Sequence, residues 1–334
     1  MLRLFKGTGP GVILITIALA GFFSIGSFLF PETHEFVYTT YPMPLASVLM
    51  PLFASSTIAP FIISLLFVLL AAAMIVTFNT GSFFINERTF LPATLYILIA
   101  SVFPYAGVFN PVLPVVAILI YAIMRIADSY RQPDISYNYF DAALMISVGS
   151  MLYANFIWFG ILLFVGLFLL RNISIREILI TIIGLITPYA ILYGIYYVSG
   201  HDLHKLTTLI GDSLFHESTD YEWSRMQIVI LIFLGLSLLV SLSYLISVFN
   251  SKKVKSRKIF SLLIWTLIIS ILVYLLVPSS SVEVFYFFLV PATCVMANYY
   301  VSRQRKKIVP ELLFTGTVVI VLVLQVLRFL NVSI

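Results

Sequence analysis

The sequence predicts an all-α fold: a polytopic bundle of about eleven transmembrane helices, some short or re-entrant, with a cytoplasmic amino terminus. Hydrophobic residues make up 61% of the 334 residues and charged residues 10%, against roughly 45–50% and 25% in soluble domains. Apolar runs of about 20 residues, the length of a membrane-spanning helix, recur along the chain. A membrane β-barrel would instead show short segments of alternating polarity. We therefore expect residues 1–334 to form one integral membrane domain.

Apolar runs separated by polar or proline-containing breaks predict the spans in order. The predicted spans are residues 11–30, 58–78, 90–107, 111–126, 139–154, 155–170, 177–198, 226–249, 259–277, 282–301 and 309–329. The third to sixth form two short pairs, interrupted at Pro104–Pro111 and at Tyr153–Asn155. Helices of 14–18 residues are about 21–27 Å long, less than a hydrocarbon layer of about 30 Å. Each pair is therefore a thin helical hairpin or a re-entrant loop.

The distribution of Lys and Arg predicts the orientation. With this span order and a cytoplasmic amino terminus, every Lys and Arg except Lys205, Arg225 and Arg328 lies on the cytoplasmic side, as the positive-inside rule requires. The basic cytoplasmic loops are 250–258 and 302–308, and the long external loops are 31–57 and 199–225. Basic loops at the membrane surface contact anionic lipid head groups, so the net charge of +5 does not indicate nucleic acid. The expected location is the bacterial inner (plasma) membrane of the cell envelope.

The second external loop, "HDLHKLTTLIGDSLFHESTDYEWSR" (201–225), collects ionisable groups that the rest of the chain avoids. Its apolar residues recur at near-helical spacing, which predicts an amphipathic helix lying on the membrane surface. These residues are Leu203, Leu206, Ile210 and Leu214. All four histidines of the chain fall on the external side, and Glu283 lies near the external end of the tenth span. The loop is either an ordinary solvated segment or part of a site.

The candidate catalytic residues are Glu32, Glu35, His201 and His204. Glu32 and Glu35 emerge from the first span at the membrane boundary, where a carboxylate can act as a general base toward a sugar hydroxyl or bind a divalent cation. His201 and His204 could assist as acid–base groups, or could hold a metal if the fold supplied a third ligand. No other cofactor is expected, and the metal ligands stay unknown. The alternative for the two glutamates is a charged helix end that holds the first span in place.

The candidate substrate-binding residues are Lys205, Arg225, His34 and His216. Lys205 and Arg225 are the external cations best placed to hold a lipid phosphate. The structural alternative is a lysine that extends to the surface from a membrane-bound helix. Within the spans, we expect Asn155, Asn298 and Gln325 to hydrogen-bond between helices.

Three stretches carry a resemblance to a known family. They are "LRLFKGTGPGVILITI", "INERTFLPATLYILIASVFP" and "SVGSMLYANFIWFGILLFVGLFLLRNISIREILITIIGLITPY", which lie within roughly the first 190 residues. The chain resembles an uncharacterised family of polytopic inner-membrane proteins from Bacteroidota, a domain of unknown function. More distantly, the short paired spans after an acidic first external loop look like membrane glycosyltransferases that use polyprenyl-phosphate sugars. That likeness implies a base or metal ligand at Glu32 or Glu35, although the chain lacks a paired acidic motif there.

Three functional hypotheses follow. The first is a glycosyltransferase-like membrane protein that handles a lipid-linked or glycan substrate at its external face, with membrane lipids and a polyprenyl-phosphate-linked substrate as partners. The second is a transporter or lipid flippase, which would need a polar cavity near the middle of the membrane. The third is a non-catalytic scaffold or assembly factor. The sequence names no protein partner.

Overall fold

The computed structural model describes residues 5, 7, 9–29, 36–53, 58–85, 87–103, 110–130, 137–170, 174–218, 221, 223–302 and 308–330. Within these ranges the regular structure is helical and no strand occurs, so the predicted all-α class is confirmed. Each predicted span carries a helix. The corresponding helices are α2 (Pro10–Leu29), α5 (Ile58–Ser82), α6 (Leu91–Ala100), α7 (Val112–Asp128), α8 (Tyr137–Ser150), α9 (Ile161–Leu170), α10 (Ile175–Val198), α12 (Arg225–Val248), α13 (Val254–Leu276), α14 (Phe285–Ser302) and α15 (Ile308–Phe329).

Six helical segments among the described residues are long and apolar enough to cross a membrane: α5, α10, α12 with its 3-10 extension, α13, α14 with the preceding 3-10 turn, and α15. Their outer faces are apolar as well. On α10, for instance, the side chains of Ile183, Ile186 and Ile191 are each more than half exposed. A contiguous apolar surface of this kind is rare in soluble monomers. The chain thus has the characteristics of a multi-pass membrane protein.

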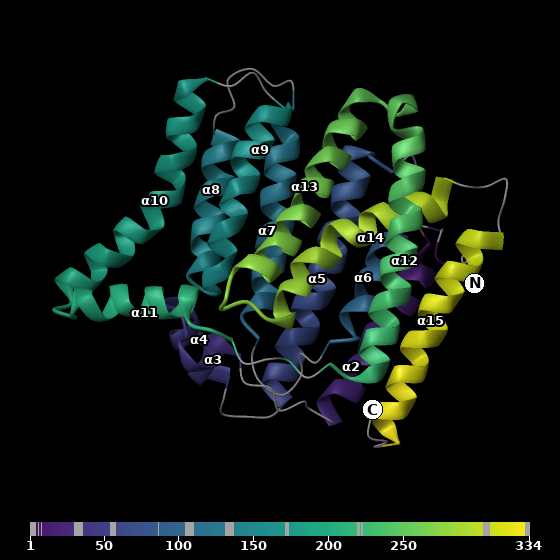
Figure 1. Ribbon diagram of the computed structural model, residues 1–334, viewed down its shortest axis with the longest axis horizontal. Coiled ribbons are helices and arrows are strands. Elements are labelled where there is room, and N and C mark those ends of the chain that lie inside the picture. The colour runs from purple at the N-terminus through teal and green to yellow at the C-terminus, as the bar shows by residue number, and fades with distance from the viewer. Residues whose placement is uncertain are drawn as a thin grey trace.

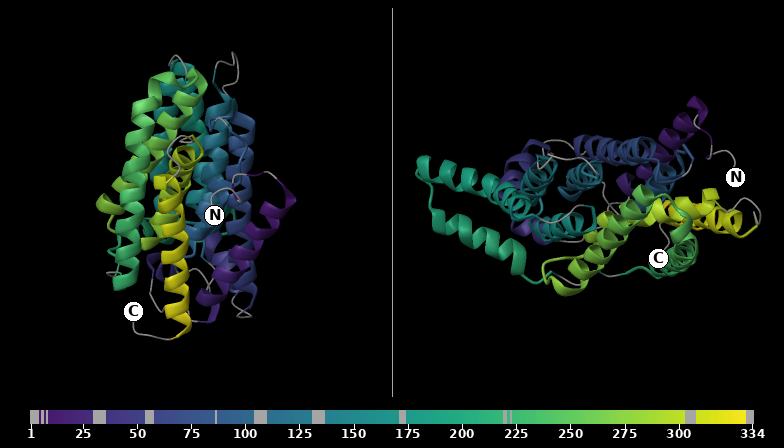
Figure 2. Two further views of the ribbon diagram at one scale, coloured as in Figure 1. Left: turned by 90° about the vertical axis from the view of Figure 1, so that its right-hand side faces the viewer. Right: turned by 90° about the horizontal axis from the view of Figure 1, so that it is seen from above.

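The helices form an elongated bundle (Figure 1). Seen from above, the helices of the first third of the chain lie along one side and those of the last third along the other (Figure 2). The two sets meet where α6 contacts α14. All ten residues of α6 are buried, as is most of α14. Helix α6, which has only ten residues, therefore lies inside protein.

Burial explains how α6 can be so short. Ten helical residues rise about 15 Å, roughly half of the hydrocarbon layer, and its last carbonyl groups cannot be left unpaired at that depth. The carbonyl oxygen of Ser101, the residue that ends α6, accepts hydrogen bonds from Gln325 Nε2 at 3.2 Å and from Arg328 Nη1 at 3.1 Å. The next carbonyl, of Val102, accepts one from Arg328 Nη2 at 2.9 Å. Two side chains of α15 thus cap the end of α6.

The second irregular pair is interrupted where the sequence predicts. Helix α8 ends at Ser150, and a 3-10 helix, η1 (Ala154–Gly160), leads into α9. Between them the chain turns at Met151–Tyr153, so the predicted break at Tyr153–Asn155 is confirmed. The break predicted at Pro104–Pro111 lies between α6 and α7, and most of it falls outside the described residues. The residues of this break are buried, so neighbouring segments must supply hydrogen-bond partners for their polar groups.

Three further helices pack at one end of the bundle, which we call the α11 end. They are α3 (Val37–Thr40), α4 (Pro44–Phe53) and α11 (Leu203–Phe215). Helix α11 runs across the bundle, whereas the turn between α12 and α13 lies at the opposite end (Figure 1). Segments from both predicted external loops are therefore at one end, and the basic segment around 250–258 is at the other.

Local sequence explains how α11 turns away from α10. Gly200 adopts φ +70°, a left-handed conformation that glycine takes without strain. Asp202 then caps the helix, because its Oδ1 accepts a hydrogen bond from the His204 backbone N–H at 2.9 Å. The helix predicted from the spacing of Leu203, Leu206, Ile210 and Leu214 is confirmed. Its Leu206 side chain is fully buried, and α11 contacts η1, so part of the apolar stripe packs on protein.

Candidate functional site

A small cavity lies at the α11 end, where four segments distant in sequence converge. Its lining comes from the α3 region, from the break after α8, from α11 and from the turn before α14. The lining residues are Val37, Tyr38, Tyr41, Met43, Tyr153, Ala154, Asn155, Ser213 and Ser279. Its volume is about 10 Å³, room for one water-sized group. The two predicted external loops thus meet at a cavity that also touches the interrupted helix pair.

A buried carboxylate, that of Glu283, is hydrogen-bonded to Tyr153, one of the residues that line the cavity. The residue belongs to the 3-10 turn η3 (Val282–Val284) that leads into α14, and its side chain is only 2% exposed. Glu283 Oε1 accepts a hydrogen bond from the Tyr153 hydroxyl at 2.9 Å and another from the Ser281 backbone N–H at 3.1 Å. Glu283 Oε2 has no hydrogen-bond partner among the described residues. One oxygen is therefore held in place, while the other is buried without a hydrogen-bond partner among the described residues.

Hydrogen bonds extend from this carboxylate to α11. Asn155 Nδ2 donates to the Tyr153 hydroxyl oxygen at 3.3 Å. The Ser279 hydroxyl lies 2.9 Å from Asn155 Oδ1 and 2.7 Å from the carbonyl oxygen of Leu214, either of which can accept its proton. Asn155 was expected to bond to another helix, but its partner Ser279 lies in the turn between α13 and η3. Polar groups from three segments form one connected network around Glu283.

Direct contacts hold the two loops together. The Ser213 hydroxyl of α11 lies 2.8 Å from the carbonyl oxygen of Tyr41, to which it can donate. The His216 ring packs against the Tyr41 ring with a centroid separation of 4.7 Å. Burial and the nearby negative charge of Glu283 raise the pKa of the Tyr38 phenol well above its usual value, so Tyr38 stays neutral. The α3 region and the C-terminal half of α11 together cover the cavity.

The predicted site residues are only partly brought together. His216 lies at the cavity rim through its contact with Tyr41, whereas His201 and His204 are exposed near the other end of α11. His204 and Ser213 are nine residues apart on this helix, about 14 Å along its axis. His201 packs on the Tyr196 ring of α10, with centroids 5.4 Å apart. These two histidines therefore do not line the cavity.

The remaining predicted residues lie elsewhere. Lys205 and Arg225 are exposed, on α11 and at the start of α12. Glu32, His34 and Glu35 fall outside the described residues. Within the described ranges, no three His, Cys, Asp or Glu side chains are grouped so that they could hold a metal ion. The residues at the cavity differ from most of those that the sequence suggested.

Sequence reasoning gave no role to Glu283 or Tyr153. Glu283 was recognisable only as an acidic residue at the edge of an apolar run, and Tyr153 only as part of a helix break. Two sequence features could have suggested this pair. One predicted span is interrupted at Tyr153, another predicted span has Glu283 near its end, and both positions were assigned to the same side of the membrane. Their pairing depends on contacts across 130 positions of the chain.

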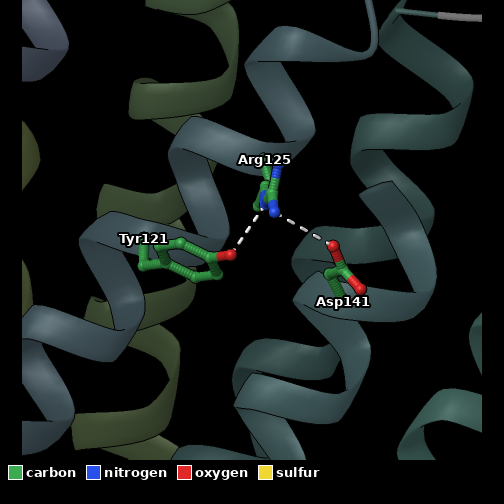
Figure 3. A network of polar contacts seen from close by, with 3 residues as sticks. All are labelled: Tyr121, Arg125 and Asp141. Carbon is green, nitrogen blue, oxygen red and sulfur yellow. Dashed lines mark hydrogen bonds and ion pairs between the residues drawn. The ribbon is translucent and has the colours of Figure 1, made fainter. Parts of the chain in front are cut away.

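Polar clusters at the other end of the bundle have a structural role. Arg125 of α7 pairs with Asp141 of α8, with 3.2 Å between Nη2 and Oδ2, and its Nε donates to the Tyr121 hydroxyl at 2.8 Å (Figure 3). Lys252 Nζ donates to Asn298 Oδ1 at 2.8 Å, and burial lowers the pKa of Lys252. The first contact joins α7 to α8. The second joins Asn298 of α14 to the turn before α13, whereas the sequence predicted a bond to another helix.

The comparisons with known proteins identify a family without an assigned function. A search of the curated proteins and a search of the solved structures find no match. The model of a family of unknown function, DUF6427, matches residues 36–333. The match includes α3, α11, the break after α8 and η3, so every segment of the cavity lies within the family region. The predicted membership of an uncharacterised family is confirmed: the chain belongs to the DUF6427 family of unknown function.

Proposed function

We propose that this membrane protein handles a lipid-linked or glycan substrate at its α11 end. The observation that carries the proposal is the Glu283 carboxylate, buried next to a cavity that both loops close, with one oxygen held and the other unpartnered among the described residues. An ionisable residue at membrane depth is costly and is by default a candidate functional group. We further propose that this end faces outward from a bacterial inner membrane, with the amino terminus cytoplasmic.

Glu283 suits a general base. Its held oxygen fixes the direction of the carboxylate, and the other oxygen could take a proton from a substrate hydroxyl or ammonium group. The hydroxyl and amide groups of Tyr153 and Asn155 would orient such a group. This assignment moves the base from Glu32 or Glu35 to Glu283. The first two remain candidates for a second carboxylate or for a divalent-cation ligand.

The exposed cations would then act at the surface. Lys205 on α11 and Arg225 at the start of α12 could hold the phosphate of a polyprenyl-phosphate-linked substrate, because both are exposed cations. His216 at the cavity rim could assist proton transfer. In this proposal His201 and His204 act only on parts of the substrate that lie outside the cavity.

The test compares Glu283→Gln with a matched control. Glutamine keeps the size of the side chain and an oxygen that can accept from Tyr153, but it is no base. Glu217 is exposed beyond the end of α11, so Glu217→Gln removes the same charge outside the cavity. Each variant is expressed in a deletion strain of the native host, and membrane lipids and lipid-linked saccharides are measured by mass spectrometry.

We expect the deletion strain and the Glu283→Gln strain to accumulate the same lipid-linked or glycan precursor, and the Glu217→Gln strain to match the wild type. Normal precursor levels with Glu283→Gln would reject a base at this position and would favour a scaffold. If the precursor keeps its chemical structure but accumulates in one leaflet, the protein moves lipid and does not modify it. Protein levels in the membrane are measured for each variant.

A further inference from the structure

The Glu283 carboxylate has no cationic partner in the part of the chain that the structure describes. Two of its hydrogen bonds come from a neutral hydroxyl and the Ser281 backbone N–H, and no hydrogen bond reaches its second oxygen within the described residues. A carboxylate withdrawn from water keeps its charge only when it is paired or fully hydrogen-bonded, and otherwise takes up a proton. The N-terminus of α14 supplies part of the compensation. A positively charged ligand would supply the rest.

Aromatic rings border the neighbouring cavity. The rings of Tyr38 and Tyr153 pack edge to face, with centroids 6.3 Å apart and planes at 75° to each other, and both residues line the cavity. Tyr41 contributes to the same lining. The faces of aromatic rings carry negative electrostatic potential and attract ammonium groups. Three tyrosines beside a carboxylate are the surroundings that such a group prefers.

The lining also disfavours an anion. No Lys, Arg or His is among the residues that line the cavity, whereas phosphate binding depends on charged donors. The lining instead offers acceptor oxygens, among them the side chains of Asn155, Ser213 and Ser279. A primary ammonium carries three N–H donors and no acceptor. The acceptor oxygens could receive the N–H groups of a primary ammonium, and the aromatic rings could contact its charge.

The size of the cavity limits what can enter. A volume of about 10 Å³ corresponds to one water-sized group, which is the size of an ammonium nitrogen. The body of a lipid or a sugar must lie outside it. The cavity would then select a substrate by the end group that it presents.

We propose that this cavity binds the protonated amine end of the substrate, with Glu283 as counter-ion and Tyr38, Tyr41 and Tyr153 around it. The proposal rests on the proposed function, since it names the class of group that the same site recognises. Two sources carry this chemistry: the ethanolamine head group of a phospholipid and an amino sugar.

Binding is tested on the full-length protein in micelles of an uncharged detergent. The probes are dihexanoyl-phosphatidylethanolamine and glucosamine, each beside its N-acetylated form, which keeps the shape but loses the charge. The readout is the midpoint temperature of unfolding as a function of probe concentration, from which a dissociation constant is obtained. The variants are Glu283→Gln, Tyr38→Leu, Tyr38→Phe and, as control, Glu217→Gln.

We expect one amine probe to bind at least about tenfold more tightly than its acetylated form, the ratio expected for one charge-assisted contact. Which amine binds identifies the source. Glu283→Gln and Tyr38→Leu should abolish this preference, whereas Tyr38→Phe, which keeps the ring, and Glu217→Gln should retain it. The Phe variant shows whether a loss reflects the missing ring face or a failure to fold.

Equal binding of amine and acetylated probes, or no binding of either, overturns the amine assignment. Accumulation of a precursor in the Glu283→Gln strain would still support the proposed function in that case. The opposite outcome is also distinguishable. If amine binding depends on Glu283 but the Glu283→Gln strain has normal precursor levels, the amine site is supported and the proposed function is rejected.

Discussion

The cap that α15 places on the end of α6 leads to a quantitative prediction for Arg328→Met. Arg328 is 8% exposed and donates to the carbonyl oxygens of Ser101 and Val102 at 3.1 and 2.9 Å. Methionine has similar length and no donor. Gln325 still donates to Ser101, but the Val102 carbonyl loses the arginine. Loss of two charged hydrogen bonds, one of them partly replaced, should destabilise the fold by about 3 kcal/mol.

The chain contains its own reporter for this experiment. Cys294 is the single cysteine of the sequence; it is fully buried in α14, the helix that contacts α6. A maleimide dye that fluoresces on reaction with a thiol therefore reports the opening of this interface on heating. A loss of about 3 kcal/mol should lower the midpoint temperature by roughly 5 °C in a protein of this size.

The matched control is Arg225→Met. Arg225 is exposed at the start of α12, so its replacement should change stability by no more than about 0.5 kcal/mol. Equal midpoints for the two variants would show that the carbonyl groups at the end of α6 find other donors, and the explanation given for this short helix would be wrong.

Two further predictions concern packing and orientation. A Cβ atom on Gly184 would lie 2.9 Å from the Phe140 carbonyl oxygen of α8, so Gly184→Leu should separate α10 from α8 and cost about 1–3 kcal/mol; Gly194→Leu, with nothing within 4 Å, should be neutral in the same thermal assay. In a chain whose own cysteine is replaced, an impermeant maleimide added to intact cells should label Thr208→Cys on α11 but not Lys253→Cys. The opposite labelling would invert the proposed orientation.

Much of the fold can be predicted from the sequence, because a segment surrounded by lipid must be apolar and helical. Continuous apolar runs predict helices, and each predicted span does contain one. The polar residues Asn155, Asn298 and Gln325 do bond to distant parts of the chain, since an isolated amide is costly among apolar helices, but their partners lie in turns or at a helix end and not within helices. The α11 helix is also predictable, because its apolar residues recur at helical spacing. These features depend on residues close together in the chain.

Span lengths were harder to predict than span positions. The sequence suggests eleven crossings, yet only six helical segments within the described ranges are long and apolar enough to cross. A helix as short as α6 is tolerated because other helices surround it and Arg328 satisfies its carbonyl groups. Neither condition is visible in the apolar run itself.

Composition and local pattern by themselves determined the helical membrane class, the order of the helices, the interruption at Tyr153–Asn155 and the surface helix, because each follows from the solvent around a short segment. The tertiary structure alone decided which polar groups meet. It placed Glu283 against Tyr153 and left His201 and His204 away from the cavity. These positions depend on how helices distant in sequence pack together, which the spacing of the histidines cannot predict.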